Sequence, residues 1–319
     1  MVSELGGTQA RARLKQALAP LKPKYVWERG ETLVRIFLFA AAAFAVMMVI
    51  AIGLSLLVPS LAFFSVVSPL EFFTGTVWSP DIPIDGQERY GVLPLLVGTL
   101  LIAGGAAAIG LPLGLGAAIY LREYAPQRVR EVVKPILEVL AGIPTVVLGF
   151  FAILTVSPIL QDWFGASFFS GANAIIVIGI LIIPLVSSLS EDALTAVPTD
   201  MRDGALALGA TRFEATSRVV VPAGLSGIGG SFILAFSRAV GETMVVVIAA
   251  GLSIYVTFNI FDPMTTMAGF IAKRATGDIP VGSVVYEALF AVGFTLLVMT
   301  LLLNLVSDWL RNRFREVYA

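Results

Sequence analysis

Cysteine and histidine are both absent from this chain of 319 residues. Without them the protein forms no disulfide, carries no thiol nucleophile and lacks the commonest metal ligands, so we expect no metal site and no cofactor bound by the chain. Charged residues are also scarce, at 13% against about a quarter in soluble domains. The net charge of −1 argues against nucleic acid as a partner, because binding a phosphate backbone needs a concentrated basic surface.

Apolar residues make up 57% of the chain, and the mean hydropathy is +0.91. Apolar runs of roughly the 20 residues needed to cross a bilayer occur at 36–58, 92–121, 139–161, 173–190, 226–251 and 288–307, and all but the fifth are free of charged residues. The first run has 23 residues, longer than the about 7–15 of a signal-peptide core, so we expect a retained anchor. The sequence predicts an all-α membrane protein with six transmembrane helices in one domain, 36–308, between an N-terminal segment 1–35 and a C-terminal tail 309–319.

Basic residues are distributed unevenly between the two sides of this predicted bundle. Lys and Arg concentrate in the N-terminal segment, in the second and fourth connections and in the tail, whereas the other connections hold only Arg89, Lys273 and Arg274. Because basic loops stay in the cytoplasm, both termini are predicted to be cytoplasmic, which requires an even number of spans.

The longest charged connection, about 191–222, is predicted to contain short helices. Thr199 and Asp200 are candidate helix caps, and Gly209 can end the first helix and let the chain turn. A helical pattern places three apolar residues near one side: Ala205, Leu208 and Phe213. From spacing alone, an amphipathic segment lying on the lipid surface explains this pattern equally well.

The same connection resembles the EAA loop of the permeases of binding-protein-dependent ABC importers, whose pattern is Glu-Ala-Ala, three residues, Gly, nine residues, then Ile-x-Leu-Pro. The matching positions here are Asp203, Gly204, Ala205, Gly209, Val219, Val221 and Pro222. The departures from the pattern keep an acidic, small or apolar residue at each place. In that family the loop docks on a separate ATPase. The resemblance therefore implies ATPase contacts by Asp203, Gly204, Ala205, Gly209, Ala210 and Pro222.

The chain has no GxxxxGK[ST] phosphate-binding loop. We therefore expect that it is not an enzyme and that any ATP, with its Mg²⁺, is bound and hydrolysed by a partner subunit.

Two ionisable residues interrupt the fifth apolar run. Arg238 falls near its middle, and Glu242 follows one helical turn later. A charge at the centre of a membrane helix costs about 2.5–3.5 kcal/mol on insertion scales. One account is an ion pair between positions i and i+4 of a single helix. The other is that Arg238 faces a water-filled path and offers its planar fork of donors to an oxyanion.

Glu242 adds a basis for selectivity to the second account. An ionised carboxylate only accepts hydrogen bonds, so it repels a fully ionised anion and can accept a proton-bearing one. Phosphate near neutral pH keeps an O–H and sulfate does not. The hypothesis is that Arg238 beside Glu242 favours phosphate over sulfate.

The segment 237–244, Ser-Arg-Ala-Val-Gly-Glu-Thr-Met, resembles the signature of phosphate-specific ABC permeases. Met244 at its end is similar to the residue found at this place in the C-type subunit of those permeases. Further similar pieces lie at 72–78, 118–126, 140–145 and 261–263. The resemblance implies a MetI-like bundle in the bacterial plasma membrane that forms half of a phosphate path, with Arg238, Glu242 and Thr243 along it. It also implies an A-type permease partner, two ATPase subunits and an extracytoplasmic phosphate-binding protein.

Two other functions remain open. The first is a permease for another oxyanion, such as sulfate or molybdate, in which the carboxylate has no evident use. The second is a secondary transporter in which Glu242 carries a proton, and the EAA-like loop counts against it.

Glycines mark the second apolar run at positions 104, 105, 110, 114 and 116. Small residues let membrane helices approach closely, so we predict that this helix packs tightly against a neighbour.

Overall fold

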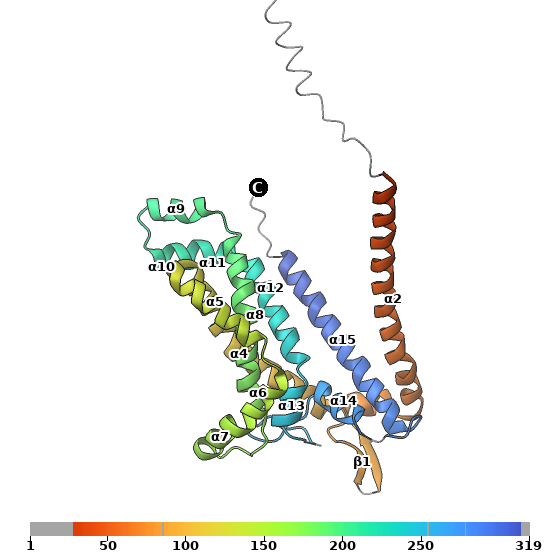
Figure 1. The fold of residues 1–319 in the computed structure, drawn as a ribbon. Coiled ribbons are helices and arrows are strands. Elements are labelled where there is room, and N and C mark those ends of the chain that lie inside the picture. Colours follow the sequence, from red (N-terminus) through yellow and green to blue (C-terminus); the bar gives the residue numbers. More distant parts are fainter. Residues whose placement is uncertain (1–27, 85, 254, 278, 314–319) are drawn as a thin grey trace, which may run out of the picture. The chain divides into compact units, whose positions relative to one another are not determined.

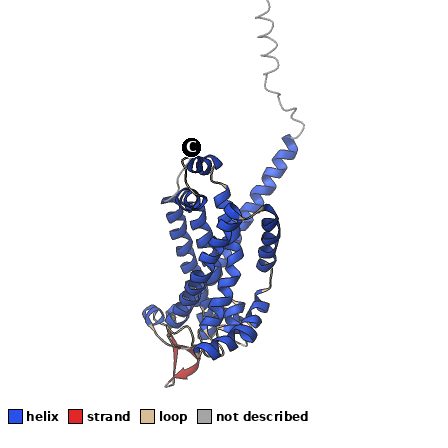
Figure 2. Cartoon of the chain, turned by 90° about the vertical axis from the view of Figure 1, so that its left-hand side faces the viewer, coloured by secondary structure: helices blue, strands red, loops and turns tan. Residues whose placement is uncertain are grey.

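The computed structural model describes residues 28–84, 86–253, 255–277 and 279–313. Most of the predicted N-terminal segment 1–35, and the last six residues of the predicted tail 309–319, therefore lie outside the described residues. The chain divides into two compact units, Met1–Gly53 and Leu54–Ala319. In the described residues, helices form nearly all of the regular structure, and the only strands form one hairpin (Figures 1 and 2).

The described helices are α2 (Glu28–Val66), α3 (Pro69–Thr74), α4 (Leu93–Ile119), α5 (Gln127–Ala141), α6 (Thr145–Phe151), α7 (Ser157–Phe164), α8 (Gly171–Thr195), α9 (Thr199–Ala207), α10 (Arg212–Ala215), α11 (Val221–Ala223), α12 (Leu225–Val240), α13 (Met244–Ala249), α14 (Met267–Ala275) and α15 (Val284–Arg313). Three π-helical turns join some of them: Tyr120–Tyr124 after α4, Ala152–Val156 between α6 and α7, and Thr216–Val220 between α10 and α11.

Five helical segments are long and apolar enough to cross a membrane: Thr32–Val66, Leu93–Tyr124, Thr145–Phe164, Gly171–Thr195 and Val284–Val306. A sixth candidate is the pair Arg212–Ala223 and Leu225–Val240, which is bent by 71°. The predicted all-helical class is therefore confirmed, with five to six spans. The third run starts later than predicted, because the chain breaks at Gly142–Pro144 between α5 and α6.

The prediction of one continuous fifth helix over 226–251 is wrong. The structure ends α12 at Val240 and starts α13 at Met244. The 16 residues of α12 span about 24 Å, short of the roughly 30 Å hydrocarbon core. Glu242 stabilises the break, because its Oε1 accepts a hydrogen bond from the Val245 backbone N–H at 3.5 Å. That N–H belongs to the first turn of α13, where amides lack a partner within the helix.

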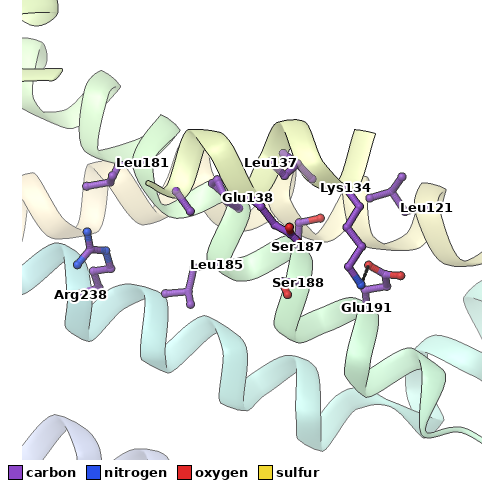
Figure 3. Close-up of a pocket in the computed structure, with 12 residues that line it drawn as sticks. Leu121, Lys134, Leu137, Glu138, Leu181, Leu185, Ser187, Ser188, Glu191 and Arg238 are labelled. Carbon is purple, nitrogen blue, oxygen red and sulfur yellow. Dashed lines mark ion pairs between the residues drawn. The ribbon is translucent and has the colours of Figure 1, made fainter. Parts of the chain in front are cut away.

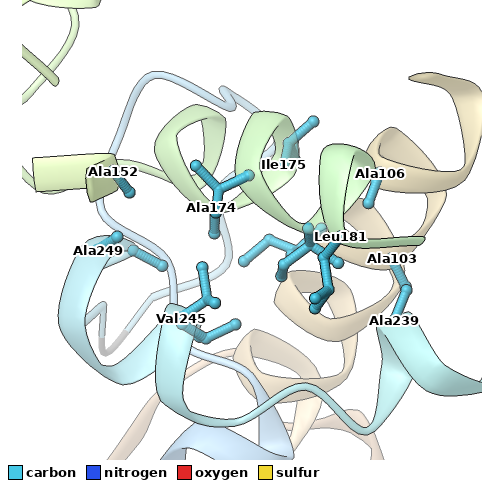
Figure 4. Close-up of a cluster of buried hydrophobic side chains, with 14 of the residues drawn as sticks. Ala103, Ala106, Ala152, Ala174, Ile175, Leu181, Ala239, Val245 and Ala249 are labelled. Atoms are coloured by element: carbon cyan, nitrogen blue, oxygen red, sulfur yellow. The ribbon is translucent and has the colours of Figure 1, made fainter. Parts of the chain in front are cut away.

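The largest buried cluster joins α4, α8, α12 and α13 (Figure 4). The predicted tight packing of the second span is confirmed for α4 against α8, since a Cβ built on Gly110 would lie 2.6 Å from the Gly179 carbonyl oxygen. At Gly114 a Cβ would lie 2.6 Å from the Val186 Cβ. Glycine at these positions lets the two backbones approach and fixes which face of α8 turns toward the rest of the bundle.

A second cluster lies beneath the hairpin of β1 (Trp78–Ile84) and β2 (Gln87–Tyr90). The strands pair antiparallel around Gly86, whose φ of 76° suits glycine. Trp78 packs edge-to-face on Phe72 and Phe270. Burial, together with a hydrogen bond from its hydroxyl to the Glu88 carboxylate, raises the pKa of Tyr90. Figure 1 shows the hairpin at the opposite end of the bundle from α9.

Candidate functional site

Arg238 projects from the last turn of α12 into a cavity of about 260 Å³. It lies 13 residues, or about 20 Å of helix rise, from Leu225 at the start of that helix. The walls come from α5, α8, α12 and the turn after α4 (Figure 3). The lining residues are Leu121, Lys134, Leu137, Glu138, Ala141, Leu181, Pro184, Leu185, Ser187, Ser188, Glu191 and Arg238.

Arg238 and the two neighbours predicted to act with it, Glu242 and Thr243, have different surroundings. Arg238 is exposed, whereas Glu242 is 7% exposed and lies in the break after α12. In the described part of the chain no ion pair joins Arg238 to Glu242, so the account of an intrahelical pair is not supported. Thr243 also lies in the break, where its hydroxyl donates to the Gly241 carbonyl at 3.1 Å. The arrangement leaves the Arg238 guanidinium available to a ligand.

A buried carboxylate joins α5 to α8 at the other end of this cavity. Glu191 is 2% exposed, forms an ion pair with Arg130 and lies 3.4 Å from the Lys134 Nζ. Sequence reasoning missed this group, having used the basic residues only for topology. A signal was present: Arg130 and Lys134 are four residues apart and therefore share a helix face. Their partner on α8 is 57 or more positions away and could not be found from local spacing.

The predicted coupling loop forms two short helices, α9 and α10, separated by a sharp turn. Gly209 has a φ of 90° and ends the first helix, as predicted. The predicted caps are wrong, because Pro198 occupies the cap position and makes no side-chain hydrogen bond, while Thr199 is already helical. Instead the cap with side-chain bonds belongs to α10, where Thr211 and Glu214 exchange hydrogen bonds of 2.9 and 3.3 Å.

Two large apolar side chains stand out from this loop: Leu208 is 91% exposed and Phe213 is 71% exposed. Of the other residues predicted there, Asp203, Gly204 and Gly209 are exposed, Ala205 and Ala210 are half-buried, and Pro222 is exposed on α11. Two large exposed apolar side chains on one loop are consistent with a surface that meets another protein or the lipid surface.

An ion pair that sequence reasoning also missed ties this loop to the bundle. The Arg202 Nε on α9 lies 3.4 Å from the Glu123 Oε2 in the π-helical turn after α4. The Glu123 side chain is 5% exposed and that of Arg202 is 32% exposed. The two residues are distant in sequence, and only the folded chain brings α9 beside the end of α4.

The fold, a bundle of candidate membrane-spanning helices, is that of a membrane permease subunit. A family model described as "Binding-protein-dependent transport system inner membrane component" matches residues 110–316, more than half of the chain. The chain belongs to this family. It is a multi-pass membrane subunit of an ABC importer and is not itself an ATPase; such subunits work with ATPase subunits and a binding protein.

Curated relatives extend the match over most of the chain. The chain is 34% identical to the "Probable ABC transporter permease protein YqgH" of Bacillus subtilis, over 88% of this chain and 90% of that protein. It is 30% identical to the "Phosphate transport system permease protein PstC" of Mesorhizobium japonicum, over 76% of this chain and 78% of that protein.

Solved structures support the fold alone. A bacterial alginate ABC transporter with its alginate-bound periplasmic protein aligns with a TM-score of 0.62 at 14% identity, over 90% of this chain and 97% of that one. The inward-facing MetNI methionine ABC transporter aligns with a TM-score of 0.55 at 18% identity, over 71% and 95%. The predicted MetI-like permease bundle is therefore confirmed.

Proposed function

We propose that this chain is the C-type permease subunit of an ATP-driven importer of inorganic phosphate and forms half of its translocation path. The observation that carries the proposal is the placement of Arg238. An arginine without an ion-pair partner among the described residues is exposed to a cavity inside a membrane bundle. A charge at membrane depth is expensive and usually serves a function. The similarity to permeases named for phosphate transport supports the choice of anion.

Arg238 suits this role chemically. Its planar guanidinium donates two parallel hydrogen bonds to a tetrahedral oxyanion and stays charged at any physiological pH. Glu242 and Thr243 are proposed contacts farther along the path, in the break between α12 and α13. Non-helical backbone at membrane depth occurs only where it is buried in protein or lines a water-filled path. The Glu242 carboxylate would then accept a hydrogen bond from a phosphate that keeps its proton.

The α9–α10 loop is the proposed docking surface for the ATPase. Leu208 and Phe213 offer exposed apolar contacts, and the ion pair of Arg202 with Glu123 gives movement of α9 a direct connection to the bundle. The proposed ATPase contacts are Asp203, Gly204, Ala205, Gly209, Ala210 and Pro222. ATP with Mg²⁺ would bind to two partner ATPase subunits.

An A-type permease would supply the other half of the path, and an extracytoplasmic phosphate-binding protein would deliver the anion. The loop that docks on the ATPase, and with it both termini, would then lie in the cytoplasm of a bacterial cell, with the permease in the plasma membrane. The proposal also includes the extent of the transmembrane domain, 36–308, between the N-terminal segment 1–35 and the tail 309–319.

The test is ATP-driven phosphate uptake by the complete transporter, comparing wild type with Arg238→Gln. Loss of a charge-assisted hydrogen bond, about 1.5–3 kcal/mol, should weaken phosphate handling by about 10- to 150-fold. The matched control is Arg128→Gln, since Arg128 is exposed on α5 and does not line the cavity. Co-purification of all subunits checks assembly. If Arg238→Gln takes up phosphate as well as Arg128→Gln in assembled complexes, the proposal is wrong.

A further inference from the structure

The cavity beside Arg238 is lined by a buried hydroxyl group that lacks a hydrogen-bond partner. Ser187 is 1% exposed and lines the cavity, yet its Oγ has no hydrogen-bond partner among the described residues. On the same helix the Ser190 Oγ is satisfied, since it lies 2.8 Å from the Ser231 Oγ. Buried hydroxyls nearly always have partners, and an orphan needs an explanation. A polar ligand in the cavity would supply the missing hydrogen bond.

The charges around the cavity identify the kind of ligand. Figure 3 shows Arg238 at one end, with Lys134 and Glu191 toward the other. Glu191 pairs with both Lys134 and Arg130, so two cations share one carboxylate and one positive charge is left over. Arg238 adds a second positive charge, and the exposed Glu138 carboxylate offsets one. Among the residues that line the cavity, Lys134 and Arg238 balance Glu138 and Glu191. Arg130, which pairs with Glu191 from outside the lining, adds the positive charge that favours an anion.

The polar groups match an oxyanion that keeps a proton. Lys134 and Arg238 donate charge-assisted hydrogen bonds to oxygen, and the hydroxyl groups of Ser187 and Ser188 donate or accept. The Glu138 carboxylate accepts a hydrogen bond and so suits an anion bearing an O–H. A cavity of about 260 Å³ is roughly nine times the ~30 Å³ share of one water molecule, so a small tetrahedral anion fits together with several waters.

We propose that this cavity is a second binding position for the transported phosphate, between Arg238 and the side of the bundle that carries α9. Lys134 and Ser187 are its ligands. Glu191 lines the far end of the cavity and lies one helical turn before the end of α8. The chain then continues directly into α9. The anion would pass from Arg238 to this position before release. The inference rests on the proposed function, because it takes phosphate as the transported anion.

The experiment is a titration of inorganic phosphate against the purified, nucleotide-free complex of all membrane and ATPase subunits, read by ³¹P line broadening in a detergent without phosphorus. Ser187→Ala should raise the dissociation constant for phosphate by about 10- to 150-fold, the effect of one hydrogen bond to a charged group. Lys134→Gln should raise it by 10-fold or more, because a charge-assisted bond is lost. Sulfate should compete poorly, since it brings no proton to Glu138.

Ser170→Ala is the matched control. Ser170 is the buried cap residue that precedes the first residue of α8, and its Oγ also lacks a partner among the described residues, but it does not line the cavity. Removing this orphan hydroxyl changes stability in the same way as Ser187→Ala and should leave phosphate binding unchanged. Equal binding by wild type, Ser187→Ala and Lys134→Gln would overturn the inference.

Two further measurements distinguish a failure of the second binding position from a failure of the proposed function, and phosphate binding from lipid binding. ATP-driven phosphate transport is measured in the same preparations. If wild type transports phosphate and both variants bind phosphate as wild type does, only the second binding position is refuted. If wild type fails to transport phosphate, the proposed function is refuted. Titrations are repeated with added phosphatidylglycerol. Displacement of the Ser187-dependent phosphate signal by this lipid would assign the cavity to a lipid headgroup and refute the inference.

Discussion

Replacing Gly110 with alanine should destabilise the packing of α4 against α8. A Cβ at this position would lie 2.3 Å from the Ile182 Cγ1 and 2.6 Å from the Gly179 carbonyl oxygen. Carbon atoms in favourable contact lie about 3.5–4.0 Å apart, so the helices must separate by roughly 1 Å. The Ile182 side chain can rotate, but the Gly179 carbonyl is held in the α8 backbone and moves only with the helix.

Gly104→Ala on the same helix provides the reference for the magnitude. Nothing lies within 4 Å of a Cβ built there. Both substitutions gain the about 0.8–1.0 kcal/mol of helix propensity that separates alanine from glycine, so their difference isolates the steric effect. Overpacking typically costs about 1–3 kcal/mol, and contact with a backbone carbonyl favours the upper part of that range.

The assay is equilibrium unfolding of the purified protein by sodium dodecyl sulfate in mixed micelles, followed by tryptophan fluorescence. Gly110→Ala should unfold at a lower detergent fraction than wild type, and Gly104→Ala at the same or a higher fraction. Because α8 carries both Ser187 and Glu191, the same displacement should also lower transport by Gly110→Ala. Equal stability of the two variants would show that the close approach of α4 and α8 is not a constraint on this fold.

Two other predictions concern parts of the chain outside the cavity. Because the pKa of Tyr90 is raised in the folded protein, the stability that the protonated Tyr90 hydroxyl contributes is fully present below the ordinary pKa of 10.0 and is lost as the pH rises above it. Between pH 9 and 11, Tyr90→Phe should therefore lose less unfolding free energy than wild type. The pair of Arg202 with Glu123 is partly exposed and worth about 0.2–1 kcal/mol. Arg202→Glu should therefore lower the amount of substrate transported per ATP hydrolysed by about 1.4- to 5-fold, and the double variant Arg202→Glu/Glu123→Arg should restore it. No recovery would indicate that the pair carries no coupling.

The membrane class and most of the spans follow from local sequence properties. Long runs of apolar residues have to be helical in lipid, because every backbone amide and carbonyl must find a partner within its own segment. Gly209 was also predictable as the end of a helix, since its φ of 90° is a conformation that glycine adopts without strain. The position of Arg238 within an apolar run was likewise visible from the sequence alone.

The break after Val240 was hidden because its cause is not hydrophobicity. The run 226–251 is apolar on both sides of the break, but the Glu242 carboxylate competes for an amide at the start of α13. The alternative account, an ion pair of Glu242 with Arg238, is not formed for the same reason: a spacing of four residues brings side chains together only on an unbroken helix.

Hydropathy and spacing along the chain were enough to predict a helical membrane bundle, its basic loop and the residue Arg238, because these depend on interactions within a few turns. The cavity, the sharing of Glu191 between Arg130 and Lys134, and the orphan hydroxyl of Ser187 depend on which faces of α5, α8 and α12 meet. Those faces are set by contacts between segments far apart in sequence, such as Gly110 against Gly179, so the folded structure was needed to reveal them.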